Sequence, residues 1–179
     1  MRFDANEKEE FERTAVVHTE SLFRVACRLL GDRSAAEDAV QETLLSGWRS
    51  FDQFQRYTNC KAWLFKIMLR IIGKGRRRQS VPTFTLEEGQ DLDNVVPVCT
   101  TKSSYTKSEI LTAIDSLPQE QRSVVLLAAV EGFTCKEISA ILEVPMGTVM
   151  SRLSRGRAEV RKWLVPCAVT RPMNSEPAG

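Results

Sequence analysis

The chain has few of the residues on which metal sites and small disulfide-stapled domains depend. Its 179 residues include one histidine, His18, and five scattered cysteines with no C-x-x-C pair: Cys27, Cys60, Cys99, Cys135 and Cys167. Zinc sites need closely spaced cysteine and histidine ligands, and disulfide frameworks need many cysteines in a short chain. The sequence therefore predicts reduced thiols and no bound metal.

Long apolar runs are also missing. No stretch approaches the roughly 20 apolar residues that a membrane-spanning helix needs. The acidic N-terminal stretch also lacks the apolar run of a signal peptide. We therefore expect a soluble, cytoplasmic protein with no membrane insertion.

The usual signatures of enzymes are absent as well. The sequence contains no Gly-rich phosphate-cradling loop, no H-E-x-x-H and no plausible set of a nucleophile with its base. An enzyme is therefore the least supported class of function, and no cofactor is expected.

Charge is nearly balanced overall but unevenly distributed. The formal net charge is only +2, with 27% charged and 42% hydrophobic residues, which is enough apolar material for globular cores. Acids crowd the first 20 residues, whereas residues 61–78 carry seven basic residues and no acid. Such asymmetry suggests separate faces for a protein partner and a nucleic-acid partner.

Apolar residues at helical spacing predict a first block of helices. They repeat over residues 11–30, where Gly31 is a natural stop. Ser34-Ala-Ala-Glu37 has the form of a capping box, which predicts a helix from there to about Phe51. A third helix is expected over about 61–78. The side chains expected to face inward on the second of these helices are Ala39, Val40, Leu44, Leu45 and Trp48.

A linker is expected to follow the first block. Residues 79–105 contain Pro82, Gly89, Pro97 and scattered acids, with no sustained apolar period. The sequence therefore divides into a first domain, a linker, a second domain and a disordered tail, and the expected boundaries are 8–79, 80–105, 106–165 and 166–179.

A second helical block follows the linker. Thr106-Lys-Ser-Glu109 and Thr134-Cys-Lys-Glu137 both have the form of a capping box. The first predicts a helix to Ser116, and the second predicts a short helix through Leu142. Pro118 fits the first position of another helix, which Gly132 ends. The last helix is expected from Thr148 to Leu164, before Pro166. No strand pattern competes, so the fold class is all-α, with two small helical domains.

A short helix, a tight turn and a second helix form the recipe of a helix-turn-helix, which places the second helix in the DNA major groove. Ile138 and Ile141 on the first helix, with Leu142, are expected to pack against the apolar face of the second. Its other residues offer groups that read base edges or hold phosphates. The candidate DNA-binding residues are Thr148, Met150, Ser151, Arg152, Ser154, Arg155 and Arg157. A solvated basic face on a surface helix is the alternative for the arginines.

The basic helix of the first block combines cations with aromatic rings. Cations track a phosphate backbone, and aromatic rings stack on unpaired bases. A base flipped out of the duplex would lie against Phe54 or Tyr57 in the preceding loop. An alternative keeps Trp63 and Phe65 in the core. The candidate DNA-binding residues of this block are Phe54, Tyr57, Lys61, Trp63, Lys66, Arg70, Arg76, Arg77 and Arg78.

A polar, acidic patch is expected on the second helix of the first block, formed by Glu37, Asp38, Gln41 and Glu42. Paired carboxylates can serve acid–base catalysis or bind metals, but no His, Cys or Lys lies nearby in sequence to complete such a site. A solvated face and a protein-docking surface remain the two interpretations.

Together these segments resemble a known family. Asp32-Arg-Ser-Ala-Ala-Glu-Asp-Ala-Val-Gln-Glu42, Trp48, Phe51, Trp63-Leu-Phe-Lys-Ile67 and the arginines 76–78 resemble region 2 of sigma-70 family factors. The segment from Leu117-Pro-Gln-Glu-Gln-Arg122 to Pro145-Met-Gly-Thr-Val-Met-Ser-Arg-Leu-Ser-Arg-Gly-Arg157 resembles region 4. Only these two regions, joined by a linker, are typical of the extracytoplasmic-function (ECF) group.

The resemblance implies partners and roles. It implies that Glu37, Asp38, Gln41 and Glu42 dock on the clamp helices of the RNA polymerase β′ subunit, with the β flap as a second contact. It implies that residues 51–78 open the −10 element and capture a displaced base. It also implies that Met150, Ser151, Ser154 and Arg155 read the −35 element, and that an anti-sigma factor binds the chain. Arg70 stands where family members often carry Asn, which affects the details of −10 recognition.

The leading function is therefore promoter recognition and DNA melting by a factor bound to core RNA polymerase. A different class remains open, a stand-alone helix-turn-helix repressor or activator that uses the second block alone. Such regulators usually dimerise and bind palindromic sites, so binding to core polymerase discriminates between the two.

Overall fold

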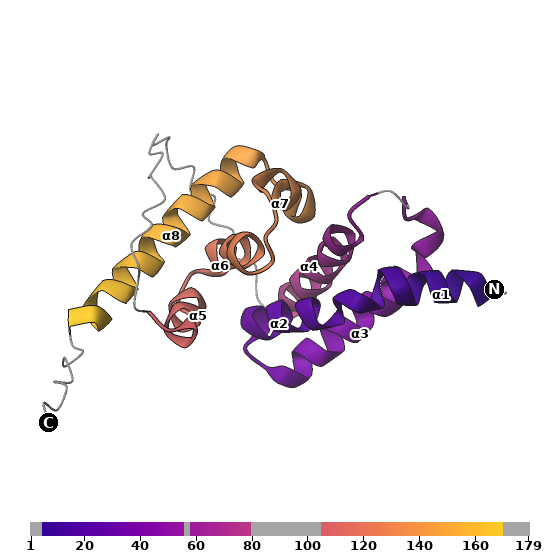
Figure 1. Ribbon diagram of the computed structural model, residues 1–179, viewed down its shortest axis with the longest axis horizontal. Coiled ribbons are helices and arrows are strands. Elements are labelled where there is room, and N and C mark those ends of the chain that lie inside the picture. The colour runs from indigo at the N-terminus through magenta and orange to yellow at the C-terminus, as the bar shows by residue number, and fades with distance from the viewer. Residues whose placement is uncertain (1–4, 56–57, 80–104, 170–179) are drawn as a thin grey trace, which may run out of the picture.

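The computed structural model describes residues 5–55, 58–79 and 105–169, with side chains described for 6–55, 58–75 and 105–164. Within these ranges the chain forms helices and no strand, which confirms the all-α prediction. Two helical bundles lie side by side (Figure 1), the first formed by the N-terminal helices and the second by the C-terminal ones. Tyr57 falls outside the described residues.

The first bundle contains four α-helices. Their bounds are α1 Ala5–Thr14, α2 Thr19–Leu30, α3 Arg33–Arg49 and α4 Cys60–Gln79, with 3-10 turns at Val16–His18 and Phe51–Gln53. The helical spacing over residues 11–30 is therefore interrupted near Val16. The Thr19 hydroxyl donates a 2.6 Å hydrogen bond to the Val16 carbonyl, and buried Ala15 leaves room for the tight turn. Gly31 ends α2 in a left-handed conformation (φ 72°), as predicted.

The predicted capping box at Ser34 was wrong. The N-cap of α3 is Asp32, whose carboxylate accepts a 2.7 Å hydrogen bond from the Ala35 amide. Asp32 lies two residues upstream and is an equally good capping residue, so the helix begins earlier. Glu37 then cannot reach back to a cap and instead pairs with Arg33, with 2.9 Å between Oε1 and Nε.

Aromatic side chains fill one end of the first core. Phe11 makes edge contacts with Trp48 and Phe51, at 5.1 Å between centroids in each case. Phe54 stacks on Phe51 and contacts Trp63 at 4.9 Å. Such ring pairs add to the stabilisation from burial alone. The cluster fixes the loop before α4 and therefore the start of that helix.

The second bundle also contains four α-helices. Their bounds are α5 Lys107–Asp115, α6 Gln119–Val125, α7 Cys135–Leu142 and α8 Met146–Val169, and a π-turn at Leu126–Val130 extends α6. Both predicted capping boxes are confirmed, because Thr106 and Thr134 each bond reciprocally with the glutamate three residues later. Gly132 has φ 76°, as expected for the residue that ends the preceding helix.

Two boundaries of α8 differ from the prediction. The helix begins at Met146 rather than Thr148, because the Pro145 carbonyl already accepts from the Val149 amide at 3.2 Å. It also continues past Pro166 to Val169. A proline removes one backbone hydrogen bond, which a helix can absorb by local bending.

The bundles contact each other along α4. This helix packs against α7, and α2 packs against α6. Phe65 of α4 meets Phe133 edge-on at 5.3 Å, and both rings are buried. At the other end of the contact, Arg28 pairs with Asp115. Apolar and charged contacts therefore both join the two bundles.

Candidate nucleic-acid interface

The helix-turn-helix is formed by α7 and α8. Ile138, Ile141, Val149 and Leu153 are buried between the two helices and the rest of the bundle, as expected. The turn is held by the Ser139 hydroxyl, which donates a 2.6 Å hydrogen bond to the Val144 carbonyl. These contacts fix the start of α8 relative to α7, which is what a recognition helix requires.

The face of α8 opposite these buried residues is open to solvent. Met150 is 55% exposed, and Ser151, Ser154 and Arg155 are exposed as well. Thr148 is half-buried, and its carbonyl accepts from the Ser151 hydroxyl at 3.0 Å. The face carries donors, acceptors and an apolar side chain, all groups that read base edges. The structure thus brings four of the sequence-predicted residues together.

One neighbouring residue escaped the sequence analysis. Met146 is 51% exposed and stands one turn before Met150 on α8. The turn was expected to extend through Gly147, which would have left Met146 outside the helix. Pro145 is the signal that could have identified Met146, because proline is common at the start of a helix.

Two of the predicted arginines lie at the edges of this face. Arg152 pairs with Glu120 of α6, with 2.6 Å between Nη2 and Oε2, and is directed away from the open face. Arg157 is exposed next to Gly156. A Cβ on Gly156 would lie 2.7 Å from Val125 Cγ2, so this glycine allows α8 to approach α6 closely.

The basic residues of α4 meet carboxylates of the second bundle. Arg70 donates to both oxygens of Glu143, at 3.1 Å from Nε and 2.6 Å from Nη2. Lys66 Nζ lies 3.2 Å from Glu143 Oε1. Hydrogen bonds from Arg70 and Lys66 hold the pKa of the Glu143 carboxyl below its usual value. Glu143 has left-handed backbone (φ 59°) and ends α7, so it stands in the turn of the helix-turn-helix.

Lys61 has a more buried partner. Its Nζ lies 2.8 Å from Glu131 Oε2, donates to the Glu131 carbonyl at 3.1 Å, and stands 5.1 Å from the centroid of Phe133. The Glu131 side chain is only 1% exposed. The Nε of Arg24 on α2 also lies 3.4 Å from Glu131 Oε1. Neither Glu131 nor Glu143 could be predicted from the sequence, because their basic partners lie about 70 positions away in the chain.

The predicted base-stacking residues differ in exposure. Phe54 is only 7% exposed and stacks within the aromatic cluster, so its ring faces are covered. Trp63 is half-buried between that cluster and the surface. Arg76, Arg77 and Arg78 belong to α4, but their side chains lie outside the described part of the chain.

The acidic patch on α3 is open to solvent. Glu37, Asp38, Gln41 and Glu42 are all exposed, and Leu45 beside them is 54% exposed. The prediction that Leu45 faces inward was wrong. Buried Thr43 and Gly47 take the inward positions on this part of α3. A larger side chain at position 47 would crowd Leu64 of α4. The patch therefore combines acids with one apolar side chain.

Both bundles match models of a known protein family. Residues 17–81 match the family model "Sigma-70 region 2", and residues 107–160 match "Sigma-70, region 4". The ECF RNA polymerase sigma factor EcfG of Rhodopseudomonas palustris is 33% identical over 80% of this chain and 79% of that relative. The chain belongs to the ECF group of the sigma-70 family.

Two further similar proteins support the assignment of this chain to the family. The ECF sigma factor SigE of Mycolicibacterium smegmatis is 35% identical over 82% of this chain, and the match spans 58% of that longer relative. A solved structure of the sigma factor RpoE in complex with the anti-sigma factor NepR, from Bartonella quintana, superimposes with a TM-score of 0.65. It is 27% identical and covers 91% of this chain and 99% of that one.

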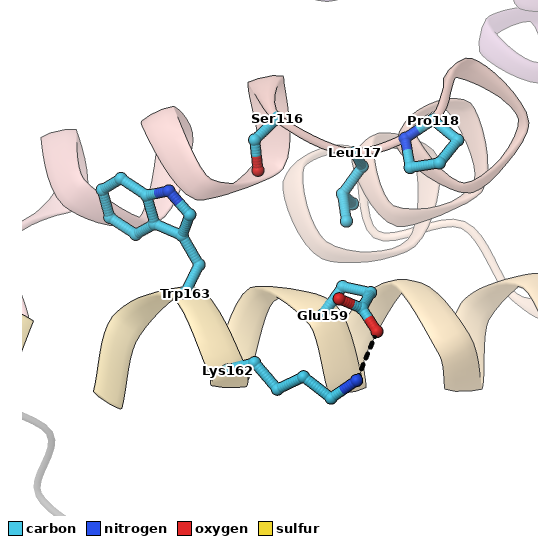
Figure 2. Close-up of a pocket in the computed structure, with 6 residues that line it drawn as sticks. All are labelled: Ser116, Leu117, Pro118, Glu159, Lys162 and Trp163. Carbon is cyan, nitrogen blue, oxygen red and sulfur yellow. Dashed lines mark hydrogen bonds and ion pairs between the residues drawn. The ribbon is translucent and has the colours of Figure 1, made fainter. Parts of the chain in front are cut away.

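A small pocket lies apart from these faces. It has a volume of about 320 Å³ and opens between the α5–α6 turn and the later part of α8. Figure 2 shows Trp163 beside Ser116, and the ion pair between Glu159 and Lys162 at the rim. Its lining offers no nucleophile with a neighbouring base. Within the described ranges, no three metal-ligating side chains cluster, and no helix is long and apolar enough to cross a membrane.

Proposed function

We propose that this sigma factor binds core RNA polymerase, positions it on promoters through α4 and α8, and stabilises melted DNA, without catalytic activity of its own. The acidic face of α3 serves the polymerase, α4 serves the −10 element and α8 serves the −35 element. The proposed location of this activity is the cytoplasm. One observation carries the proposal: a single chain presents an exposed acidic face and, on a separate bundle, an exposed face of methionine, serine and arginine side chains.

The α3 face is proposed to bind the clamp helices of the β′ subunit. Asp38, Gln41 and Glu42 recur at helical spacing on one side of α3, and Leu45 extends that side by one turn. An exposed apolar residue beside acids fits the apolar contacts and charged rim of a protein interface. Acids on this face also complement a basic partner and speed its association. The β flap is proposed as the contact of the second bundle.

The DNA contacts are proposed as two separate grips. Met150, Ser151, Ser154 and Arg155 read bases of the −35 element in the major groove, with Thr148 and Arg157 nearer the phosphates. Arg152, which pairs with Glu120, lies nearer the core. Lys61, Lys66, Arg70 and the arginines 76–78 hold the backbone at the −10 element. Trp63 is the half-buried ring best placed to meet an unpaired base there. Phe54 supports Trp63 from within the core, and Tyr57 remains a candidate for base capture.

An anti-sigma factor is proposed as a further partner. The Bartonella sigma factor that superimposes on most of this chain was solved with the anti-sigma factor NepR. This chain has the same two helical bundles. An anti-sigma factor would cover faces of this chain that otherwise bind polymerase or DNA.

The decisive experiment measures binding to core RNA polymerase. We expect the tagged wild-type chain to retain purified core enzyme in a pull-down. Reversing two charges on α3, Asp38→Lys with Glu42→Lys, removes the proposed complementarity and should abolish retention. The matched control is Glu9→Lys with Glu12→Lys, which makes the same charge change on exposed positions of α1.

Retention that survives the α3 reversal unchanged would contradict the docking assignment. Failure of the wild-type chain to bind core enzyme at all, with intact binding to palindromic duplexes, would favour a stand-alone regulator instead. Sequencing transcripts started in vitro by this chain with core polymerase would then define its promoters.

A further inference from the structure

Two methionine side chains are exposed to solvent at the start of α8. Met146 is 51% exposed and Met150 is 55% exposed. Within residues 146–164, the part of α8 whose side chains the structure describes, they are the large apolar residues left exposed. Contact with water is unfavourable for apolar surface. A partner that covers both side chains therefore gains binding free energy at this position.

The two methionines form a single row, which we call the methionine row. Residues four positions apart lie on the same side of an α-helix, one turn from each other. At about 100° per residue, the row lies between buried Val149 and exposed Ser154. Arg155 lies farther round the helix, at the other edge of the exposed face. The exposed face therefore has an apolar edge and a basic edge.

The methionine row lies where a recognition helix meets the bases. Met146 is the first residue of α8, and the first turns of this helix lie beside α7 (Figure 1). Recognition helices contact base edges with residues near their N-terminus. Gly147 lies between the two methionines. Apart from its chain neighbours and the backbone of its own helix, nothing in the described part of the chain would lie within 4 Å of a Cβ added there. The space beside the row is therefore open at the first turn.

The charges on α8 favour DNA as the partner that covers the row. Residues 146–164 contain five basic residues and one acid, Glu159. Glu159 is paired with Lys162, whereas Arg157 and Arg161 are exposed. Such a helix attracts the phosphate backbone of a duplex. The apolar group that base edges present in the major groove is the C5-methyl group of thymine. This methyl group therefore matches an apolar row on a basic helix.

We propose that Met146 and Met150 set a promoter preference of this chain by contacting the C5-methyl groups of two thymines in the −35 element. The inference rests on the proposed role of α8 at that element and adds Met146 to its base-reading residues. Four residues of helix rise by about 6 Å, and base pairs stack about 3.4 Å apart. The two thymines are therefore expected about two base pairs apart. Unbranched methionine side chains adjust their shape, so each methyl group can lie on either strand.

The first test selects duplexes with the full chain bound to core RNA polymerase. The probes are two libraries of duplexes with about ten random base pairs, one turn of DNA. One library contains thymine, and the other contains uracil, which forms the same base pair but lacks the C5-methyl group. Sequencing of the bound and the input DNA gives the enrichment of each base at each position. Core polymerase alone gives the background.

We expect thymine to be enriched about fourfold at each of two positions, the factor that corresponds to burial of one methyl group. In the uracil library this enrichment should fall to background at the same two positions, while any guanine that Arg155 selects stays selected. Equal enrichment of thymine and uracil would overturn the proposal, because groups other than the methyl would then select the base.

The second test assigns the two thymines to side chains. Met146→Ala removes most of an apolar side chain and should abolish enrichment at one thymine position while leaving the other intact. Met150→Ala should do the reverse. Met146→Leu keeps an apolar side chain and should keep both positions. The matched control is Ile110→Ala, which shortens an exposed apolar residue of the same bundle on α5, outside the helix-turn-helix. It should also keep both positions.

The −35 role of α8 can fail separately. If the wild-type chain with core polymerase enriches no sequence above background, α8 does not read a −35 element, and the proposal falls with that role. If sequences are enriched but Met146→Ala and Met150→Ala leave the thymine preference unchanged, the −35 role stands and the methionine row does not read bases. Weaker retention of core polymerase by Met146→Ala, with the thymine preference unchanged, would assign the row to a protein contact and overturn the proposal.

Discussion

The two bundles expose their nucleic-acid faces to different degrees. On α8, Met150 and Ser154 project into solvent. On α4, Lys61 and Arg70 are bound by carboxylates of the other bundle. The proposed −35 face on α8 is thus exposed, whereas the cations of α4 are paired with carboxylates. For the proposed roles, the difference means that the cations of α4 must leave their carboxylates before they can contact phosphates, whereas the side chains of α8 need no such change.

Their interiors differ as well. The first bundle packs large aromatic rings around the loop before α4. The second packs aliphatic side chains and brings two helices together at Gly156, where a Cβ would come within 2.7 Å of Val125. A core built on close helix approach tolerates added volume poorly. Substitutions in each bundle can therefore test whether the two cores respond differently to added volume.

The largest effect is expected from filling the close approach. Gly156→Leu forces α8 away from α6 and should destabilise the second bundle by about 3 kcal/mol, the upper end for overpacking a core. The control is Gly73→Ala on α4, where nothing lies within 4 Å of a new Cβ. It should stabilise the first bundle by about 0.5–1 kcal/mol through helix propensity. Hydrogen exchange read separately over α4 and α8 measures both. Unchanged protection of α8 in Gly156→Leu would show that the helices do not need to approach so closely.

An intermediate effect is expected at the open face. Arg155→Ala should lose discrimination at one −35 position by about 1–3 kcal/mol, as for a bidentate arginine–guanine contact. Arg161→Ala, an exposed arginine further along α8, is the control and should leave discrimination intact. Anisotropy titrations with duplexes changed one base pair at a time provide the measurement. A uniform loss over all duplexes would instead identify Arg155 as a phosphate contact.

The smallest effect is expected at the helix starts. Asp32→Ala should cost about 1 kcal/mol in the first bundle, and Thr134→Ala about the same in the second, since each removes an N-cap acceptor. Ser34→Ala should cost nearly nothing, because Asp32 already caps α3. Denaturant unfolding compares the three. Greater loss in Ser34→Ala than in Asp32→Ala would restore the capping box that the sequence first indicated.

These helix caps also show how much of the fold can be predicted from short sequence patterns. Thr106 and Thr134 were predicted correctly, because the cap and its glutamate lie three residues apart and have no strong competitor. Ser34 failed because Asp32 satisfies the same pattern two positions earlier. Leu45 failed because Leu44 and Leu45 were both assigned to the buried face, although adjacent residues lie about 100° apart around a helix. Only the packing of α3 on α4 shows that Leu45 is the exposed one.

The candidate site divides in the same way. The exposed residues of α8 could be predicted, because helix periodicity separates them from Val149 and Leu153. The pairing of Lys61 with Glu131 could not, because 70 positions separate them and neither residue carries a local signal. Contacts between the bundles depend on tertiary packing, which no pattern within one helix encodes.

The burial of Glu131 has a consequence for ionic strength. Dissolved ions screen charges over about 10 Å at 0.1 M salt, but only where solvent reaches them. Glu143 and Arg70 are open to that screening, whereas the Glu131 side chain, 1% exposed, is shielded from it. Rising salt should therefore weaken the ion pair of Glu143 with Arg70 first and leave the pair of Glu131 with Lys61 in place.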